Sequence, residues 1–308
     1  MAESVLIAPL HWGLGHASRC IPIIKDEIEQ GNLVYISANG KQKALLKEHF
    51  PDAQYVDIPF MDITYPKNGN VSLHFALRGP KLVFNIWREH YRLKRVIDRF
   101  SIDKVISDSR FGLWNKHAKS VFITHQVDIK TPFFQSAINS INRWVMNHYD
   151  EVWIPDYEEK PGLAGELSHP AELLENSKYI GPLSRFNKKL QKESHFKYDV
   201  LAMISGPEPQ RTLFEIQLRK QFQIDGKKAL ILKGNPKDKE SFEDGDITTK
   251  NHLLDEELLV ALSQSKEVHA RSGYSTIMDF HALGIGAKFY PTPGQTEQEY
   301  LAELHQNK

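Results

Sequence analysis

The segment from residue 11 to residue 16, His-Trp-Gly-Leu-Gly-His, combines two glycines with a histidine, a pattern suited to ligand binding and proton transfer. Gly13 and Gly15 permit a tight turn that brings backbone N–H groups close to a ligand such as a phosphate. An imidazole at this place can serve as a general base, so His16 is a candidate catalytic residue. A packing or capping role for His16 is the alternative, and the segment alone does not decide between the two.

The same segment does not fit a dinucleotide-binding loop. That loop requires a third glycine, where this chain has Ser18, and an acidic residue after the second strand, where it has Ser37-Ala38-Asn39. The sequence therefore disfavours a dehydrogenase.

Three further segments carry polar groups suited to a phosphorylated sugar. Residues 205–211 offer backbone N–H groups near an expected helix start, together with Arg211, which can pair with phosphate. Residues 270–279 gather hydroxyl and N–H groups at another helix start, where Asp279 can accept hydrogen bonds from ribose hydroxyls. Residues 291–300 carry amide and carboxylate side chains that can bind sugar hydroxyls. Each segment can instead be a turn with a helix cap, but all of them, like the first, follow an expected strand.

Alternating strands and helices must position these segments, and the apolar pattern predicts them in both halves of the chain. In the first half we expect strands at 4–10, 33–37, 55–58, 104–107, 121–124 and 152–155, and helices at 17–30, 41–49, 73–100 (interrupted at Gly79-Pro80) and 134–148. In the second half we expect strands at 200–205, 229–232, 268–271 and 288–291, and helices at 212–222, 256–264, 275–283 and 297–305. This order predicts an α/β fold of two Rossmann-like domains that face a cleft, with ligands at the carboxyl ends of the strands. The domains are expected at 1–160 and 199–308, joined by a connection at 161–198.

The composition limits the function further. A chain of 308 residues corresponds to about two domains, and its 39 basic and 39 acidic residues give no net charge, which argues against nucleic acid as a partner. The single cysteine, Cys20, excludes an intrachain disulfide and fits a reducing compartment. The chain has no signal-peptide pattern and no apolar run of ~20 residues, so we expect a cytoplasmic protein. The histidines show no metal-ligand spacing, and Asp244-Gly245-Asp246 is expected to be a solvated turn, so no metal is expected.

From Val5 to Ala302 the chain resembles the GT-B glycosyltransferases related to family 28, whose best-known member adds N-acetylglucosamine to a lipid-linked peptidoglycan precursor. The most specific parts of the resemblance are residues 271–284 and 294–300. By this resemblance the glycine-rich segment and His16 face the acceptor and the donor phosphates, and His125 and Gln126 lie on the acceptor side. It further implies a diphosphate site, ribose binding by Asp279, and sugar binding by the pair Gln298 and Glu299; the diphosphate residues would be Gly13, Gly15, Gly206, Arg211, Ser272, Gly273, Ser275 and Thr276.

The chain departs from the family pattern in three places. Glu299 replaces the second glutamine of the sugar-binding pair, which leaves the donor sugar open. The loop at Gly206 contains fewer glycines than in the family. The sequence stops soon after Tyr300, so we expect either that it is truncated or that the return helices of the family are short or missing.

The resemblance implies an inverting, metal-independent transfer of a sugar from a nucleotide donor, such as UDP-N-acetylglucosamine, to a glycan or lipid-linked acceptor, with no cofactor. We expect His16 to be the base, and Asp108, near the end of its strand, to be the other candidate. The alternatives are a sugar-nucleotide 2-epimerase or hydrolase of the same fold, and a degenerate nucleotide-sugar-binding subunit that needs a partner. Peripheral contact with the inner face of the membrane stays open, because several members of the family use lipid-linked acceptors. The segment 132–149 carries apolar residues at helical spacing, a pattern that indicates core packing more often than membrane docking.

Overall fold

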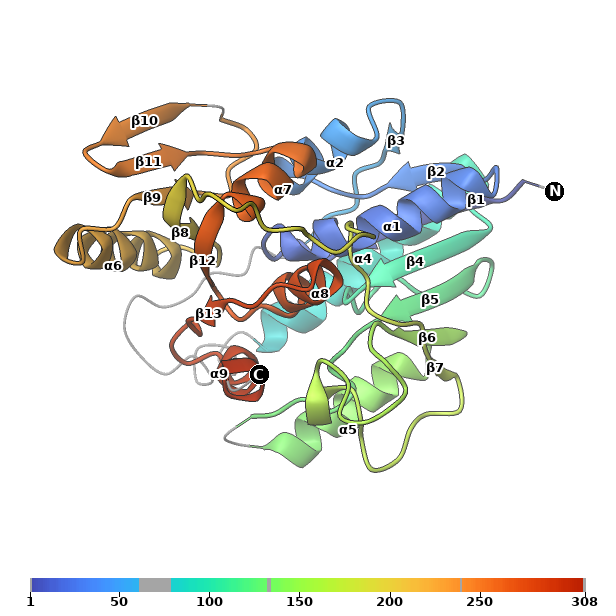
Figure 1. Cartoon of the computed structure of the whole chain (residues 1–308). Coiled ribbons are helices and arrows are strands. Elements are labelled where there is room, and N and C mark those ends of the chain that lie inside the picture. The colour runs from blue at the N-terminus through green and yellow to red at the C-terminus, as the bar shows by residue number, and fades with distance from the viewer. Residues whose placement is uncertain (1, 61–78, 132–133, 239, 307–308) are drawn as a thin grey trace. The chain divides into compact units, whose positions relative to one another are not determined.

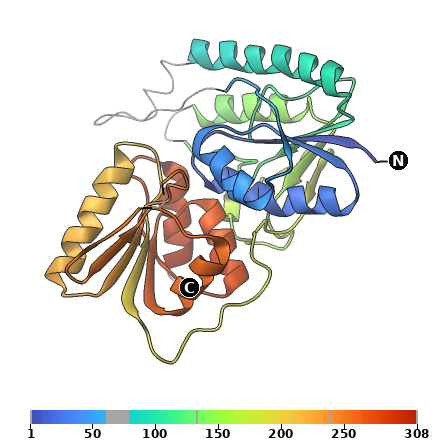
Figure 2. The ribbon, with the colours of Figure 1, turned by 90° about the horizontal axis from the view of Figure 1, so that it is seen from above.

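The computed structural model describes residues 2–60, 79–131, 134–238 and 240–306. The chain divides into two compact units, of which the first ends at Arg185 and the second begins at Phe186. Each unit contains a mostly parallel sheet with helices on both faces (Figures 1 and 2), which confirms the predicted α/β class.

The first unit is built on a parallel sheet with the strand order β3-β2-β1-β4-β5-β6-β7 in its described residues. Its strands are β1 (Ser4–Pro9), β2 (Leu33–Ile36), β3 (Gln54–Tyr55), β4 (Lys104–Asp108), β5 (Lys119–Ile123), β6 (Glu151–Ile154) and β7 (Ser177–Tyr179). The register pairs Pro9 with Asp108, so the loop after β1 begins beside the end of β4. The two sequence segments that carry His16 and Asp108 are thereby brought to the same edge of the sheet.

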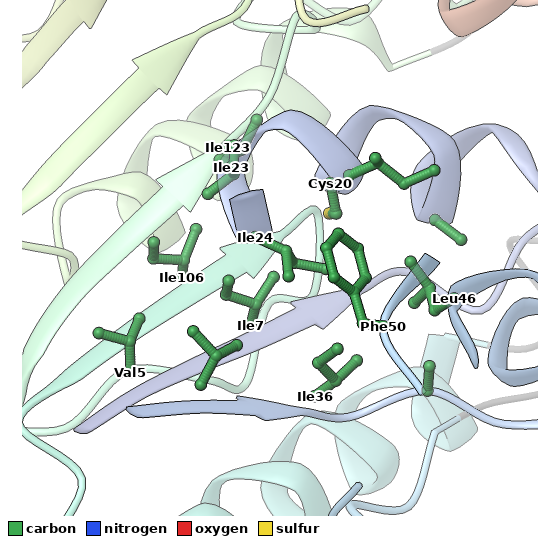
Figure 3. Close-up of a cluster of buried hydrophobic side chains, with 14 of the residues drawn as sticks. Val5, Ile7, Cys20, Ile23, Ile24, Ile36, Leu46, Phe50, Ile106 and Ile123 are labelled. Carbon is green, nitrogen blue, oxygen red and sulfur yellow. The ribbon is translucent and has the colours of Figure 1, made fainter. Parts of the chain in front are cut away.

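Helices cover both faces of this sheet. They are α1 (Gly15–Glu29), α2 (Gly40–His49), α4 (Gly79–Phe100) and α5 (Gln135–Met146), with a short 3-10 helix, η1 (Gly165–Leu167). Figure 2 shows α1 and α2 on one face and α4 and α5 on the other. Apolar residues of α1 recur at helical spacing, so Cys20 and Ile24 pack against Ile7 and Ile36 of the strands, as Figure 3 shows.

The second unit has a sheet with the strand order β10-β11-β9-β8-β12-β13 in its described residues. Its strands are β8 (Tyr198–Met203), β9 (Ala229–Leu232), β10 (Ser241–Asp244), β11 (Ile247–Lys250), β12 (Ser265–Ala270) and β13 (Lys288–Phe289). All neighbouring strands run parallel except β10 and β11, which form an antiparallel hairpin.

The helices of the second unit are α6 (Gln210–Ile224), α7 (Asp255–Ser263), α8 (Tyr274–Leu283) and α9 (Thr296–Gln306). Phe214, Leu218 and Phe222 of α6 are buried against one face of the sheet. Figure 2 shows α7 and α8 on the other side of these strands. Because α8 follows β12 directly, its N-terminus lies at the carboxyl edge of the sheet, where the sequence places the diphosphate residues.

The structure differs from the expected elements in three places. The segment expected at 161–198 to be a connection contributes β7 to the first sheet, and the division between the units falls after Arg185. The hairpin of β10 and β11 is an addition that the apolar pattern did not indicate, because every β10 side chain is exposed and β11 contains a single apolar residue, Ile247. Residues 73–78 of the expected long helix lie outside the described residues, and α4 begins at Gly79.

Candidate active site

The loop between β1 and α1 is fixed by a side chain from α2. The amide nitrogen of Gln42 donates hydrogen bonds to the carbonyl oxygens of Leu10 and Gly13, each at 2.7 Å, and Gln42 itself is buried. Gly13 has a φ of +78°, which an L side chain rarely adopts. This loop therefore has one defined conformation, and α1 begins immediately after it at Gly15.

His16 and Asp108 are in direct contact. His16 is the second residue of α1, and its Nδ1 lies 2.9 Å from Oδ2 of Asp108, the last residue of β4. The side chain of His16 is 18% exposed, whereas that of Asp108 is 0% exposed. Of the two sequence-predicted bases, His16 is thus the one that reaches the surface, while Asp108 lies behind it.

A buried arginine shares this carboxylate. Nε of Arg19 lies 3.0 Å from each carboxylate oxygen of Asp108, and Nη2 of Arg19 also donates to Oδ1 of Asp108. Nη2 lies 3.0 Å from Nδ1 of His16 as well. Because α1 places Arg19 one helical turn after His16, both side chains reach Asp108 from the same helix.

The protonation of the cluster follows from its burial and its charges. Burial alone would raise the pKa of Asp108, but Arg19 and then His16 lower it well below its usual range, so Asp108 is a carboxylate. Burial lowers the pKa of His16, with Asp108 acting in the opposite direction. Burial raises the pKa of the Cys20 thiol, whose Sγ lies 3.8 Å from Asp108. At neutral pH the cluster therefore contains a neutral imidazole, a carboxylate and a guanidinium.

The tautomer of His16 decides whether it can act as a base. Asp108 can accept a hydrogen bond only from a protonated Nδ1, and this tautomer leaves Nε2 free to take a proton. Arg19 can donate only to an unprotonated Nδ1, which describes the other tautomer. The contacts at 2.9 and 3.0 Å are thus alternatives, and proton transfer requires the one with Asp108.

The acceptor-side pair predicted by the sequence follows β5. Nδ1 of His125 lies 3.3 Å from Nη1 of Arg19, so His125 joins the cluster around Asp108 and is itself buried. Gln126 is half-buried, and its backbone N–H donates to Oγ1 of Thr124. The structure therefore brings His16, Asp108 and His125 together through Arg19.

In the second unit, several predicted residues meet where β12 and β13 end. Oγ of Ser272 donates to the carbonyl oxygen of Gln298, and the backbone N–H of Thr292 donates to Oε1 of Gln298 at 2.9 Å. A Cβ added to Gly206 would lie 3.8 Å from Oγ1 of Thr292, so the loop after β8 lies at the same place. Ser272 and Thr292 are both 0% exposed. These contacts join the loops after three strands into one surface.

The remaining predicted residues of this unit take up the following places. Gly273 is the N-cap of α8, and Ser275 and Thr276 are in its first turn, each half-buried. Asp279 lies further along the same helix and is largely buried. Oε1 of Glu299 accepts a hydrogen bond from the backbone N–H of Gly294.

Arg211 is predicted from the sequence to bind phosphate, but in the structure its guanidinium contacts other protein groups. Its guanidinium lies 3.4 Å from Oε1 of Glu208 and donates to the carbonyl oxygen of Lys233. In this arrangement Arg211 ties the start of α6 to the loop after β9, and a role with phosphate would require it to leave these partners.

Arg271 is a further structural link at the same edge. It donates to the carbonyl oxygens of Tyr290, Pro291 and Gln210, and its guanidinium lies 4.0 Å from the centre of the Phe214 ring. It also borders a hollow of about 340 Å³ beside α6, and no residue predicted for the site lines that hollow.

The Asp244-Gly245-Asp246 segment forms the turn of the β10–β11 hairpin. Gly245 has a φ of +58°, and Asp244 lies 3.5 Å from Arg219 of α6. Within the described residues, no three His, Cys, Asp or Glu side chains gather in a way that could hold a metal ion.

Sequence reasoning missed Arg19, Gln42 and Thr292. Arg19 carried a usable signal, because a charged residue stands three positions after His16 on the helix side that carries buried residues. Gln42 and Thr292 carried none, since each acts through contacts with residues distant in the sequence.

No helix in the described part of the chain combines the length and apolar character needed to cross a bilayer.

Comparisons with known proteins find this chain similar to glycosyltransferases. No family model matches the chain. An uncharacterized glycosyltransferase of Methanosarcina acetivorans is 24% identical over 318 residues, which cover 95% of this chain and 80% of the relative. Among solved structures, Acinetobacter baumannii MurG matches with a TM-score of 0.52 and 12% identity, covering 100% of this chain and 84% of MurG.

Two further solved structures have a similar fold. The spinosyn rhamnosyltransferase SpnG matches with a TM-score of 0.62 and 11% identity, covering 97% of this chain and 83% of SpnG. Phytolacca americana UGT2, solved with UDP-2fluoro-glucose and pterostilbene, matches with a TM-score of 0.58 and 12% identity, covering 98% of this chain and 83% of UGT2. The chain thus has the GT-B fold, and the predicted resemblance to GT-B glycosyltransferases is confirmed.

Proposed function

We propose that this protein is an inverting, metal-independent glycosyltransferase that moves a sugar from a UDP-sugar to an acceptor hydroxyl. Glycosyltransferase activity is supported by the relative in Methanosarcina acetivorans and by the fold. The finer proposal rests above all on the contact of His16 with the buried carboxylate of Asp108 at the end of β4.

His16 is proposed as the general base that activates the acceptor. Asp108 holds the Nδ1–H tautomer, so that Nε2 takes the proton of the acceptor hydroxyl while its oxygen attacks the anomeric carbon. Attack opposite the leaving diphosphate in one step inverts the anomeric configuration. Asp108 itself is not proposed as the base, because it is fully buried and bound by Arg19 and His16.

The N-terminus of α8 is proposed as the diphosphate site. Backbone N–H groups at a helix start and the helix dipole stabilise the negative charge that develops on the leaving UDP. The hydroxyls of Ser275 and Thr276 lie in the first turn and can add hydrogen bonds. Neutralisation by such donors makes a metal ion unnecessary for the departure of the diphosphate.

UDP is the proposed nucleotide, with Asp279 at the ribose. Phytolacca americana UGT2 was solved with UDP-2fluoro-glucose, and Arabidopsis thaliana UGT89C1, a structural neighbour with a TM-score of 0.59, with UDP-L-rhamnose. UDP-N-acetylglucosamine is the proposed donor on the resemblance to family 28. Gln298 and Glu299 would contact the donor sugar. Oε1 of Gln298 already accepts the backbone N–H of Thr292, so Gln298 would offer the sugar its amide N–H groups and one further lone pair.

Calorimetric titration with UDP, GDP, dTDP and ADP tests the donor proposal. We expect selective binding of UDP, weakened about tenfold or more in Asp279→Ala, because a hydrogen bond to a carboxylate contributes about 1.5–3 kcal/mol. The Asp199→Ala variant, which removes an exposed carboxylate of β8, is the matched control and should bind UDP normally. Absence of nucleotide binding, or equal affinity of the Asp279 variant, would refute the proposal.

Measurements of UDP release then distinguish a transferase from a hydrolase or epimerase and from a subunit that needs a partner. Incubation with UDP-N-acetylglucosamine and candidate acceptors should release UDP only when an acceptor is present. Release of UDP with a free or epimerised sugar in the absence of acceptor would instead indicate a hydrolase or epimerase. Tight UDP binding without turnover on any acceptor would indicate a subunit that needs a partner.

We also propose peripheral contact of the first unit with an anionic lipid surface through α4. Trp87 is 60% exposed, and Phe84 and Tyr91 lie on either side of it with ring centres 6.2 and 5.8 Å away. Arg88 and Arg95 lie over the rings of Phe84 and Tyr91, so this row of exposed aromatic side chains carries positive charge. Aromatic and basic groups on one helix are the combination that binds anionic membrane surfaces.

Sedimentation with vesicles tests this contact. The protein should bind phosphatidylglycerol-containing vesicles more than phosphatidylcholine vesicles, and Trp87→Ala should reduce the bound fraction severalfold. Phe242→Ala removes an exposed aromatic ring of β10 and is the matched control. Equal binding of both variants and the parent would exclude α4 as the contact.

A further inference from the structure

Arg19 is a buried cation at the centre of the candidate active site, and the proposed transfer gives it no task. It is 2% exposed and lies on α1, one turn after His16. Its guanidinium contacts both oxygens of Asp108, Nδ1 of His16, Oγ of Ser109 and Nδ1 of His125. Burying a guanidinium costs desolvation free energy, which these polar contacts offset, and its charge acts on the titratable groups that it contacts.

We propose that Arg19 is a positioning residue, which shares the carboxylate of Asp108 with His16 and thereby keeps His16 a neutral imidazole ready to accept a proton. This inference rests on the proposed role of His16 as the base.

The charges of the cluster support the inference. In a histidine–aspartate pair without a further cation, the carboxylate stabilises the imidazolium and so favours protonation of the histidine. Here the guanidinium of Arg19 already compensates the charge of Asp108, so protonation of His16 would leave a net positive charge in a buried place. Two other titratable groups face the cluster. Cys20 is an uncharged thiol, because burial raises its pKa. Nδ1 of His125 lies 3.3 Å from Nη1 of Arg19, on the side of the guanidinium.

The pKa direction of His16 agrees with this geometry. Burial is the largest cause of its lowered pKa, Asp108 acts to raise it, and Arg19 acts with burial to lower it further. The consequence for catalysis is a base that stays unprotonated, and so competent, at a lower pH than an ordinary histidine. The bidentate contact of Arg19 also fixes the orientation of the Asp108 carboxylate, which in turn orients the His16 ring.

An NMR titration of the histidines in the full chain tests the inference without any substrate. The protein is labelled with ¹⁵N-histidine, and the His16 signal is assigned by its loss in His16→Gln. In Arg19→Met we expect the pKa of His16 to rise by about one unit or more, because the carboxylate then acts on the imidazole alone. In Arg19→Lys, which keeps a cation beside Asp108, the pKa should lie closer to that of the parent.

The pH dependence of turnover gives a second readout. A higher pKa means that His16 becomes protonated at a higher pH, so the acid limb of the kcat/KM profile should move to higher pH in Arg19→Met by the same amount as the NMR pKa. A merely structural arginine would lower activity at every pH and leave the position of the acid limb unchanged.

Two further variants keep the result interpretable. Arg110→Met removes another buried arginine, which pairs with Glu89 and makes no hydrogen bond to His16, so it should disturb packing while leaving the pKa of His16 unchanged. Should Arg19→Met fail to fold, Arg19→Gln tests the same idea, because its neutral amide can still hydrogen-bond in the buried site but carries no cation, so the pKa of His16 should again rise.

An unchanged pKa of His16 in Arg19→Met, or in Arg19→Gln if that is the variant that folds, would overturn the inference. Its failure is distinguishable from failure of the proposed function. If His16→Gln retains full turnover, the base assignment is wrong, and the NMR titration still reports whether Arg19 sets the protonation of His16.

Discussion

The candidate centre of the first unit is a set of charged side chains that contact one another, whereas at the strand-end surface of the second unit the side chains, Arg271 included, bind backbone groups. His16, Arg19 and Asp108 contact one another directly, and the pKa values of His16 and Asp108 depend on the charges of the neighbouring groups. Ser272 and Gln298, by contrast, bind backbone groups and hold loops in place. The first arrangement is suited to moving a proton, and the second to holding a ligand without changing its own charge state. The two regions should therefore respond differently to mutation.

The largest effect is expected from truncating the charged centre. His16→Ala should lower kcat about 10²- to 10⁴-fold, the usual contribution of a general base, because no other exposed group of the cluster can take the proton. Calorimetry should show unchanged UDP affinity, since the donor is assigned to the second unit. His117→Ala, in an exposed turn of the same unit, is the matched control. A loss of UDP affinity together with kcat would contradict the proposed separation of proton transfer in the first unit from donor binding in the second.

A smaller effect is expected from a backbone change in the second unit. Gly206 has a φ of +106°, so Gly206→Ala should cost about 1–3 kcal/mol of backbone strain or shift the loop after β8, which lies beside Thr292. The added methyl group meets Thr292 only at ordinary contact distance, so the cost lies in the backbone. We expect UDP to bind up to about tenfold more weakly, while the pKa of His16 stays unchanged.

Gly226→Ala supplies the control for that change. Gly226 also has a positive φ, of +59°, and it lies after the end of α6, before β9 begins. Urea unfolding should show that both variants lose stability, while only Gly206→Ala loses UDP affinity. If the two variants bind UDP equally well, the surface at the ends of β8, β12 and β13 is not the donor site.

Most of the fold could be predicted, because its elements carry their own apolar pattern. The strand at Ala229–Leu232 coincides with the predicted one, and α1 differs from the predicted helix by two residues at its start and one at its end. The apolar pattern did not predict the strands that bury few side chains. β7 alternates half-buried and exposed residues over Ser177–Tyr179, and β10 is exposed throughout, so neither could be distinguished from a loop.

The candidate site was predictable in its positions and not in its interactions. Because parallel strands end at one edge, His16 and Asp108 could both be placed near it. Their contact, however, depends on the register of β1 with β4. The role of Arg19 depends on its side chain reaching from α1 to the end of β4, which the sequence does not indicate. The engagement of Arg211 with Glu208 and Lys233 could not be inferred either, since a guanidinium finds its partners only in the folded chain.

The outermost strands of both sheets are short. β3 and β13 have two residues each, and β7 has three. β10 has four residues, which are all exposed and include Glu243 and Asp244. An unpaired strand edge can recruit another chain through its free N–H and C=O groups, and short or charged edges oppose that recruitment. The described sheets therefore offer little backbone for pairing with a second molecule, so the fold protects itself against edge-to-edge aggregation at high protein concentration.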